Sequence, residues 1–346
     1  MENRRIYHII GAGLAGLYTA KLLKEYNPAA YVIVYESAEK IGGRCQSFFT
    51  SEFGCQVDNA THVLLNCNSL AQSLIGKECF QHIIRFYDIH HTKFIPILRA
   101  LDDVHLAVFN SPHTSYRQKF YLYCQLFPFW GLKAYFSGGD LESRLCRPLL
   151  QYCDEIRYGW IWKDIRLSDT FVYQLIFNKG SVNILPNDII ISAIDSYNYH
   201  KIIGGFDFEY SSICNLFYRT SMPLTLPHNC RMLGIHGGKS QWLFSTSQYS
   251  SVTISNSGTA NIHPRDIWQE ICTIRDYNSA FLPTYQIRNF PRATICQDER
   301  NNAKRPVSAT TSFQNLFICG DWTMKNRPCC IETALQSARR VCNTIK

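Results

Sequence analysis

Residues 9–16 read Ile-Ile-Gly-Ala-Gly-Leu-Ala-Gly, and residues 32–36 read Val-Ile-Val-Tyr-Glu. The first stretch has the form of an apolar strand, a glycine turn and a helix start, and the second is an apolar strand that ends in an acid. Glycines at this spacing allow a sharp turn and close approach to a pyrophosphate, which the helix N-terminus faces. The sequence therefore predicts a dinucleotide-binding unit in which Glu36 accepts hydrogen bonds from the adenosine ribose. The turn residues expected at the cofactor are Gly11, Gly13, Leu14, Ala15 and Gly16.

A second glycine turn follows that acid at residues 42–45, which read Gly-Gly-Arg-Cys. Paired glycines let the chain pass close to a bulky ligand, and a guanidinium there can meet phosphate or flavin carbonyl oxygens. The stretch resembles the Gly-Gly-Arg segment of the flavin-containing amine oxidase and carotenoid desaturase superfamily. The resemblance implies that the cofactor is FAD and that Gly42, Gly43 and Arg44 bind it.

The C-terminal part agrees with this resemblance. Residues 315–322 read Asn-Leu-Phe-Ile-Cys-Gly-Asp-Trp, a buried strand that ends in Gly-Asp, and an amphipathic helix is predicted from residue 331 to about residue 345. In the superfamily, the aspartate holds the ribityl chain and the helix points its N-terminus at the pyrimidine edge of the isoalloxazine. Gly320, Asp321 and Ile331 are therefore further expected FAD residues.

Residues 53–65, 232–244 and 328–332 resemble, in order, stretches of the squalene-associated branch whose best-known members are hydroxysqualene dehydroxylases. This resemblance implies that a substrate hydroxyl is replaced by hydrogen from reduced flavin, which yields squalene. The chain departs from the branch at residues 60–61 and 329–330, and its segment from His62 to Gly138 is shorter than the family's cap. Two alternatives stay open: a desaturase or amine oxidase on another apolar substrate, and a flavin-binding protein with a degenerate pocket and no turnover.

His62 is the histidine that lies inside a family-like motif, and it is the candidate catalytic residue. It has two interpretations: protonation of a leaving hydroxyl, or a structural hydrogen bond to a backbone carbonyl. No metal site is expected, because the adjacent pair His90 and His91 would point apart and has no further ligand at the right spacing.

The expected fold class is α/β, with a Rossmann-type FAD-binding domain interleaved with an α+β substrate domain, as in amine oxidases. The FAD-binding domain is predicted at residues 1–66, 181–205 and 305–346, and the cap and substrate domain at 67–180 and 206–304. Within them we expect helices at 141–153 and 266–275, and strands at 188–193, 213–218, 241–244 and 251–255.

Composition sets further expectations. A chain of 346 residues with 46% hydrophobic residues is long and apolar enough for two domains. Its fifteen cysteines contain no Cys-x-x-Cys pair, which favours buried, reduced thiols. The first strand begins within about six residues and no apolar stretch reaches the ~18 residues that span a bilayer, so we expect a cytoplasmic protein without a signal peptide.

The expected ligand is an apolar small molecule, and no nucleic-acid partner is expected. The net charge of +8 and the aromatic residues 120–136 are compatible with peripheral contact at the inner face of the membrane. That aromatic stretch has three interpretations: the lining of an apolar tunnel, a lipid interface, or an ordinary core helix.

Overall fold

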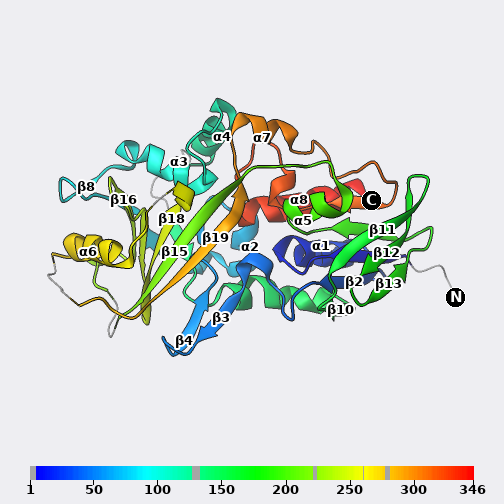
Figure 1. The fold of residues 1–346 in the computed structure, drawn as a ribbon, viewed down its shortest axis with the longest axis horizontal. Coiled ribbons are helices and arrows are strands. Elements are labelled where there is room, and N and C mark those ends of the chain that lie inside the picture. The colour runs from blue at the N-terminus through cyan, green and yellow to red at the C-terminus, as the bar shows by residue number, and fades with distance from the viewer. Residues whose placement is uncertain (1–4, 127–132, 221–223, 260, 277–280) are drawn as a thin grey trace. The chain divides into compact units, whose positions relative to one another are not determined.

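A computed structural model describes residues 5–126, 133–220, 224–259, 261–276 and 281–346. The chain divides into two compact units, each assembled from segments that are far apart in the sequence (Figure 1). Unit 1 comprises Met1–Gln46, Leu141–Phe208 and Arg300–Lys346, and unit 2 comprises Ser47–Asp140 and Glu209–Glu299. The predicted α/β fold with two interleaved parts is therefore confirmed.

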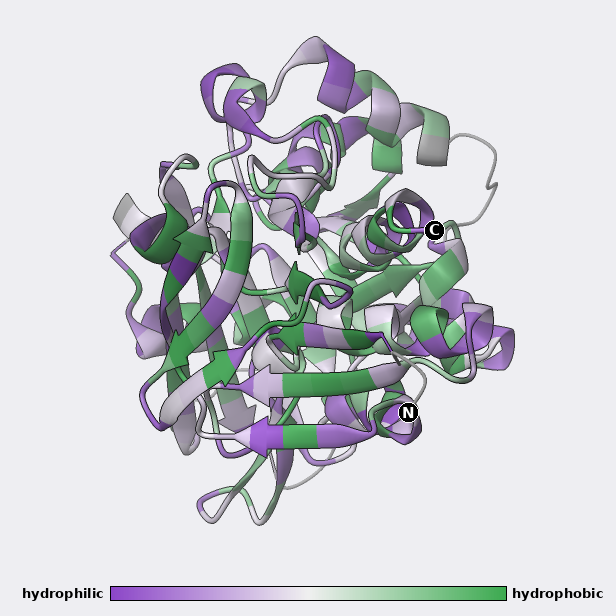
Figure 2. Cartoon of the chain, turned by 90° about the vertical axis from the view of Figure 1, so that its right-hand side faces the viewer, coloured by the Kyte–Doolittle hydropathy of each residue, from purple (hydrophilic) through white to green (hydrophobic). Residues whose placement is uncertain are grey.

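Unit 1 is built around a parallel sheet of five strands. Four of the strands are short, mostly buried apolar runs, as is usual when helices cover a parallel sheet, whereas the edge strand at residues 155–158 is half-buried and carries Glu155 and Arg157. Figure 2 shows hydrophobic residues along strands of the chain. Ile10 pairs with Tyr35 on one side and Ser192 on the other, so three strands end at the same edge. In sheet order the strands are β10 (Glu155–Tyr158), β2 (Tyr31–Glu36), β1 (Ile6–Ile10), β14 (Ile189–Ser192) and β20 (Leu316–Ile318).

The helices of unit 1 include the two that the sequence places beside the cofactor. In α8 the residues Leu335, Ala338 and Val341 are fully buried, and their spacing gives the helix one apolar face. This face packs against α1, where the Cys342 thiol lies 3.9 Å from the Thr19 carbonyl oxygen. The predicted helix from residue 331 is confirmed. The helices are α1 (Leu14–Tyr26), α5 (Ser196–Ile203), α7 (Glu299–Lys304) and α8 (Ile331–Thr344).

A small antiparallel sheet of β11 (Trp162–Ser168), β12 (Phe171–Phe177) and β13 (Gly180–Asn183) completes unit 1. The predicted single helix over 141–153 is instead a π-helical turn, η4 (Glu142–Cys146), followed by a 3₁₀ helix, η5 (Arg147–Tyr152). Pro148 lies in the first turn of η5, and its missing N–H prevents the hydrogen bond that a continuous α-helix needs there.

Unit 2 contains a sheet of seven strands, antiparallel except where β7 pairs with β16. The predicted strands at 213–218, 241–244 and 251–255 are confirmed as members of this sheet. In sheet order it comprises β19 (Tyr285–Ile295), β15 (Tyr210–Arg219), β18 (Tyr249–Ser255), β17 (Trp242–Ser245), β16 (Met232–His236), β7 (Arg85–Asp88) and β8 (Lys93–Ile95).

Two smaller sheets and several helices surround the seven-stranded sheet of unit 2. The sheets are the hairpin β3 (Ser47–Thr50) and β4 (Cys55–Asp58), and the three strands β5 (Val63–Leu65), β9 (Lys133–Phe136) and β6 (His82–Ile83). The helices are α2 (Ser69–Ile75), η2 (Lys77–Cys79), η3 (Ile97–Arg99), α3 (Leu101–Phe109), α4 (Tyr116–Leu126), η6 (Pro227–Asn229), η7 (Ser257–Thr259) and α6 (Pro264–Ile274). The predicted helix at 266–275 corresponds to α6.

The borders of the compact units lie elsewhere than the predicted domain borders at residues 66 and 180. Residues 47–66 belong to unit 2, because the β3–β4 hairpin and β5 are part of its sheets. Residues 141–180 belong to unit 1, because β10 pairs with β2 in the parallel sheet. The pairing of β5 with β9 and the pairing of β10 with β2 each join strands that are far apart in the sequence, so neither leaves a local pattern.

The aromatic stretch 120–136 spans three different environments. In α4, Leu122 is buried in the core of unit 2, whereas Phe120 is 69% exposed. Residues 133–136 form β9, and its last three residues are buried. Phe127 and Trp130, on which a membrane or tunnel role would depend most directly, lie outside the described residues.

Candidate flavin site

The first glycine turn connects β1 to α1 in the way the sequence predicts. Gly11 has φ +108°, a conformation that a side chain disfavours, and a Cβ on Gly16 would lie 2.1 Å from the Gly11 carbonyl oxygen. A Cβ on Gly13 would instead have no atom within 4 Å. Gly13 is the N-cap of α1, so open space lies beside the amides that begin the helix. This geometry suits a pyrophosphate approaching the helix N-terminus.

The second glycine turn lies against the first. The Gly42 amide donates to the Ala12 carbonyl at 2.9 Å, and a Cβ on Gly43 would lie 3.5 Å from the Gly13 Cα. Gly42 and Gly43 have φ values of +103° and +54°, which explains two adjacent glycines at this point. The structure therefore brings together two turns that are separated by about thirty residues in the sequence.

Glu36 lies at the end of β2 and is 7% exposed. Its Oε2 accepts a hydrogen bond from the Ala12 amide at 2.7 Å, and its Oε1 accepts from the Ala38 amide at 2.8 Å and from the Ser37 hydroxyl at 3.1 Å. The carboxylate thus fixes the β1–α1 turn and the segment after β2. A carboxylate oxygen can accept two hydrogen bonds, so Oε2 keeps the capacity to accept from a ribose hydroxyl.

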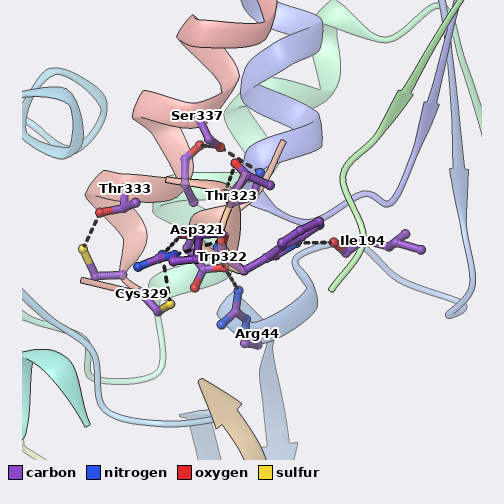
Figure 3. Close-up of polar contacts among 12 residues, drawn as sticks. Arg44, Ile194, Asp321, Trp322, Thr323, Cys329, Thr333 and Ser337 are labelled. Carbon is purple, nitrogen blue, oxygen red and sulfur yellow. Dashed lines mark hydrogen bonds and ion pairs between the residues drawn. The ribbon is translucent and has the colours of Figure 1, made fainter. Parts of the chain in front are cut away.

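Asp321 lies in the turn after β20 and its side chain is 4% exposed. The Arg44 guanidinium donates to its Oδ1 at 2.7 Å, and the Trp322 amide donates to the same oxygen at 3.0 Å (Figure 3). Both contacts that the described residues make with this carboxylate involve Oδ1. Oδ2 can therefore accept from a ligand hydroxyl.

Arg305 and Ser337 support this turn, and the sequence analysis did not assign a role to either. The Arg305 guanidinium is buried and donates to the carbonyls of Asp321, Trp322 and Arg327. The Ser337 hydroxyl accepts from the Gly320 amide at 2.8 Å (Figure 3). The Arg305 and Ser337 side chains bind backbone atoms, which every residue type has, so these partners leave no pattern in the sequence. The available sequence signals are an arginine before a proline and a serine on the apolar face of α8.

The starts of two helices complete the set of expected cofactor residues. Leu14 and Ala15 are the first residues of α1 and are buried, and Ile331 is the first residue of α8 and is 7% exposed. The amides in the first turn of a helix lack intrahelical partners and carry partial positive charge. Each helix start can therefore face a negatively polarised group of a cofactor.

None of the fifteen cysteines, all of which lie in described residues, forms a disulfide. Burial raises the pKa of Cys319 and of Cys342 to about 12, so both remain thiols at neutral pH. Cys146 is also buried, and a hydrogen bond with Cys45 together with burial raises its pKa well above the usual value. These thiols of unit 1 are packing groups and not nucleophiles.

His62 lies in unit 2, directly before β5. Its Nδ1 lies 2.8 Å from the Ala60 carbonyl oxygen, so the neutral ring carries its proton on Nδ1 and donates it there. Its main chain is held by Ser137, whose hydroxyl accepts from the His62 amide at 2.9 Å. The contact with Ala60 is the kind expected of a structural histidine, and it leaves the lone pair of the neutral ring on Nε2.

Two kinds of feature are absent from the described residues: a metal-binding cluster and a membrane-spanning helix. Among the residues that the structure describes, no group of three or more histidine, cysteine or acidic side chains could hold a metal ion. No described helix combines the length and the apolar character required to cross a membrane.

The residues of unit 1 fit FAD. The open face of Gly13, the two close glycine turns and the α1 start suit the pyrophosphate, and the Glu36 carboxylate suits the adenosine ribose. The open oxygen of Asp321 and the beginning of α8 suit the ribityl chain and the flavin. All of the residues expected at the cofactor therefore belong to one unit, although they come from both ends of the chain.

Two family models match the ends of the chain. Residues 9–75 match the NAD(P)-binding Rossmann-like domain, and residues 260–346 match the flavin containing amine oxidoreductase family. The first match covers both glycine turns and Glu36, and the second covers Asp321 and α8. These matches agree with the two parts of unit 1 that the structure brings together.

The chain is also similar over its length to curated bacterial proteins. It is 26% identical to a hydroxysqualene dehydroxylase of Sinorhizobium fredii over 410 aligned positions, which cover 96% of each chain. It is 26% identical to a hydroxysqualene dehydroxylase of Rhodopseudomonas palustris over 98% of this chain and 97% of that one. Because the alignments exceed the 346 residues of this chain, the relatives contain additional residues.

A solved structure gives the same fold assignment. The crystal structure of a putative protoporphyrinogen oxidase from Exiguobacterium sp. 255-15 superposes with a TM-score of 0.70 at 10% identity, covering 100% of this chain and 99% of that one. The sequence matches and this fold agree with the cofactor geometry of unit 1. The chain is an FAD-dependent oxidoreductase that resembles hydroxysqualene dehydroxylases along its length and, over residues 260–346, the flavin containing amine oxidoreductase family.

Proposed function

We propose that this enzyme reduces hydroxysqualene to squalene. The observation that carries the proposal is the similarity to hydroxysqualene dehydroxylases along nearly the whole chain, which includes unit 2 as well as the flavin-binding segments. Flavin binding alone would not distinguish this reaction from others of the superfamily. A match that also covers unit 2 supports a shared substrate, since we propose unit 2 as the substrate domain.

The proposed reaction breaks the carbon–oxygen bond of the substrate and forms a carbon–hydrogen bond. The hydroxyl leaves as water after it gains a proton. Reduced FAD, when bound, supplies the hydride and is left oxidised. The protein must therefore orient an apolar chain, exclude water and provide a proton at the departing oxygen.

We assign the cofactor contacts as follows. The amides at the start of α1 and the two glycine turns hold the pyrophosphate, with Gly13 as the point of closest approach. Glu36 binds the adenosine ribose through Oε2, and Asp321 binds the ribityl chain through Oδ2. Arg44 pairs with Asp321 and holds its carboxylate in place. The start of α8, at Ile331, faces the pyrimidine edge of the flavin.

We further propose His62 as the proton donor. The Ala60 carbonyl fixes one ring nitrogen, so that a proton gained by the ring is carried on Nε2. A protonated imidazole placed beside a leaving hydroxyl can give it a proton. The structural role of His62 and this chemical role are separable, because they use different ring nitrogens.

The proposal is tested by expressing the chain in cells that also make hydroxysqualene and extracting the lipids. Squalene should accumulate at the expense of hydroxysqualene when the chain is present. A matched strain that carries the Asp321→Asn variant controls for host enzymes. Persistence of hydroxysqualene beside folded, flavin-loaded protein would contradict the proposal and favour another apolar substrate or a protein without turnover.

A further inference from the structure

A basic surface pocket in unit 2 is not used by the flavin chemistry. Its volume is about 190 Å³, and it lies between the β6–β7 segment and the η6 segment before β16. Its lining contains two arginines, two histidines and two carboxamides, and no acidic residue. The lining residues are Gln81, His82, Ile83, Arg85, His228, Asn229, Cys230 and Arg231.

One arginine of this basic pocket begins a strand, and the other directly precedes the neighbouring strand, which runs parallel to the first. Arg85 begins β7 and pairs with Leu233 of β16, and Arg231 precedes Leu233 by two positions. Both side chains line the same pocket. Both are exposed, and within the described residues neither side chain has an ion pair or hydrogen bond.

Aromatic contacts hold the pocket in shape. The Arg85 guanidinium lies 6.0 Å from the ring centroid of Phe94, and that ring packs edge-on against His228 at 4.7 Å. His82 packs against Phe136 at 4.7 Å. Burial and the charge of Arg231 lower the pKa of His82, so this imidazole is neutral at pH 7 and can donate one N–H.

Two guanidinium groups that share a pocket without a carboxylate repel each other, and a bound anion would remove this repulsion. Guanidinium groups bind phosphate oxygens through paired, charge-assisted hydrogen bonds, and neutral histidine and carboxamide groups can add further donors. The pocket has room for roughly six water molecules. This is enough for a phosphate or diphosphate group and too little for a long apolar chain.

We propose that the basic pocket of unit 2 binds a phosphate or diphosphate group. The group could be carried by a soluble molecule or by the headgroup of an anionic lipid. Both sources present the same chemistry to Arg85 and Arg231. The site is separate from the flavin pyrophosphate contacts, since every residue assigned to those contacts lies in unit 1.

The test uses flavin-loaded protein, so that the nucleotide site does not take up the probe. Pyrophosphate binding is measured by calorimetry at pH 7 and low salt for the wild type and for the double variant Arg85→Gln, Arg231→Gln. The control double variant is Arg265→Gln, Lys163→Gln, which removes the same charge at exposed positions that do not line the pocket. We expect the pocket variant to lose at least tenfold in affinity and the control to stay within about twofold.

A second arm identifies the source of the phosphate. Vesicles of phosphatidylcholine with phosphatidic acid are sedimented with each protein, with and without pyrophosphate. Headgroup binding predicts sedimentation that pyrophosphate and the pocket variant both abolish, whereas a soluble source predicts calorimetric binding without sedimentation. The proposal is overturned if wild-type protein binds neither probe, or if both double variants lose binding equally. Circular dichroism and flavin content show whether each variant is folded.

Discussion

Glu36 and Asp321 are buried carboxylates that each hold a backbone amide of the turn in which they act. Glu36 fixes the turn after β1, and Asp321 fixes the turn after β20 and accepts from Arg44. A substitution at either position therefore changes local structure as well as ligand contacts. Experiments at these residues need to separate flavin affinity from folding.

For Glu36→Gln we expect weaker FAD binding and a less stable protein. Both oxygens of the Glu36 carboxylate accept from backbone N–H groups. The side-chain NH₂ of the glutamine would therefore face one of these N–H groups whichever way the carboxamide is turned. Loss of a hydrogen bond to a charged group costs about 1.5–3 kcal/mol, or about 10- to 100-fold in Kd. Flavin fluorescence titration and urea unfolding measure the two effects. Glu39→Gln, an exposed control three residues later, should change neither, and equal effects at both positions would remove Glu36 from the site.

For Asp321→Asn we expect FAD affinity to fall by about tenfold or more. The carboxamide keeps the shape of the side chain but lacks the charge that pairs with Arg44 and the second acceptor oxygen. Equilibrium dialysis against FAD measures the change, and Asp169→Asn at an exposed turn is the control. Wild-type affinity in the Asp321 variant would show that the carboxylate does not contact the ribityl chain.

Two substitutions separate the roles of His62. An asparagine amide can replace Nδ1 and keep the bond to the Ala60 carbonyl, whereas a glutamine amide reaches toward the position of Nε2. A proton donor predicts that both variants bind FAD and that both reduce the rate of substrate reduction by about 10²- to 10⁴-fold. The decline of wild-type activity as the pH rises past the pKa of the donor should also disappear. A structural histidine predicts that His62→Asn retains the wild-type rate and pH profile.

At the scale of elements, the β1–α1–β2 segment and α8 were predictable because their signals are local. A glycine with positive φ, an apolar strand and an amphipathic helix each leave a pattern within a few residues. The addition of β10 beside β2, and of β7 beside β16, leaves no such pattern, because partners in parallel pairs are distant in sequence. For the same reason, the sequence does not predict the role of Arg305 or the presence of the basic pocket.

The start of β1 depends on Asp188, which precedes β14. Asp188 is buried and accepts from the Ile6 amide at 3.1 Å and the Leu185 amide at 2.9 Å. Burial raises the pKa of this carboxyl, but the His8 ring, 3.5 Å away, and the hydrogen bonds from the Leu185 and Ile6 amides outweigh burial and lower it. Because the folded-state pKa lies below the usual value of 3.8, Asp188 stabilises the fold above that pH and loses this contribution as the pH falls further.

We therefore expect Asp188→Asn to destabilise the protein by about 1–3 kcal/mol at neutral pH. The difference from wild type should be constant between about pH 6 and pH 8 and should shrink below about pH 4. Urea unfolding followed by circular dichroism at several pH values measures it. A difference that grew toward low pH would show that the carboxylate does not stabilise the β1–β14 pair.

At the scale of the whole molecule, the sequence predicted unit 1 more fully than unit 2. The residues expected at the cofactor belong to motifs with fixed spacing, and one unit contains them all. The predicted tunnel or membrane role of the aromatic stretch depends on Phe127 and Trp130, which lie outside the described residues. A pocket for an apolar substrate depends on its shape and does not require a fixed sequence motif, so the residues that contact such a substrate leave little pattern in the sequence.

The most direct test of the proposed reaction is a single turnover with purified, flavin-loaded protein under anaerobic conditions. The bound flavin is reduced with dithionite, excess reductant is removed, and hydroxysqualene is added. The proposal predicts reappearance of the oxidised flavin spectrum and one squalene formed per flavin oxidised. Stably bound, reduced flavin that is not oxidised by hydroxysqualene, with no squalene in the extract, would contradict the proposed function.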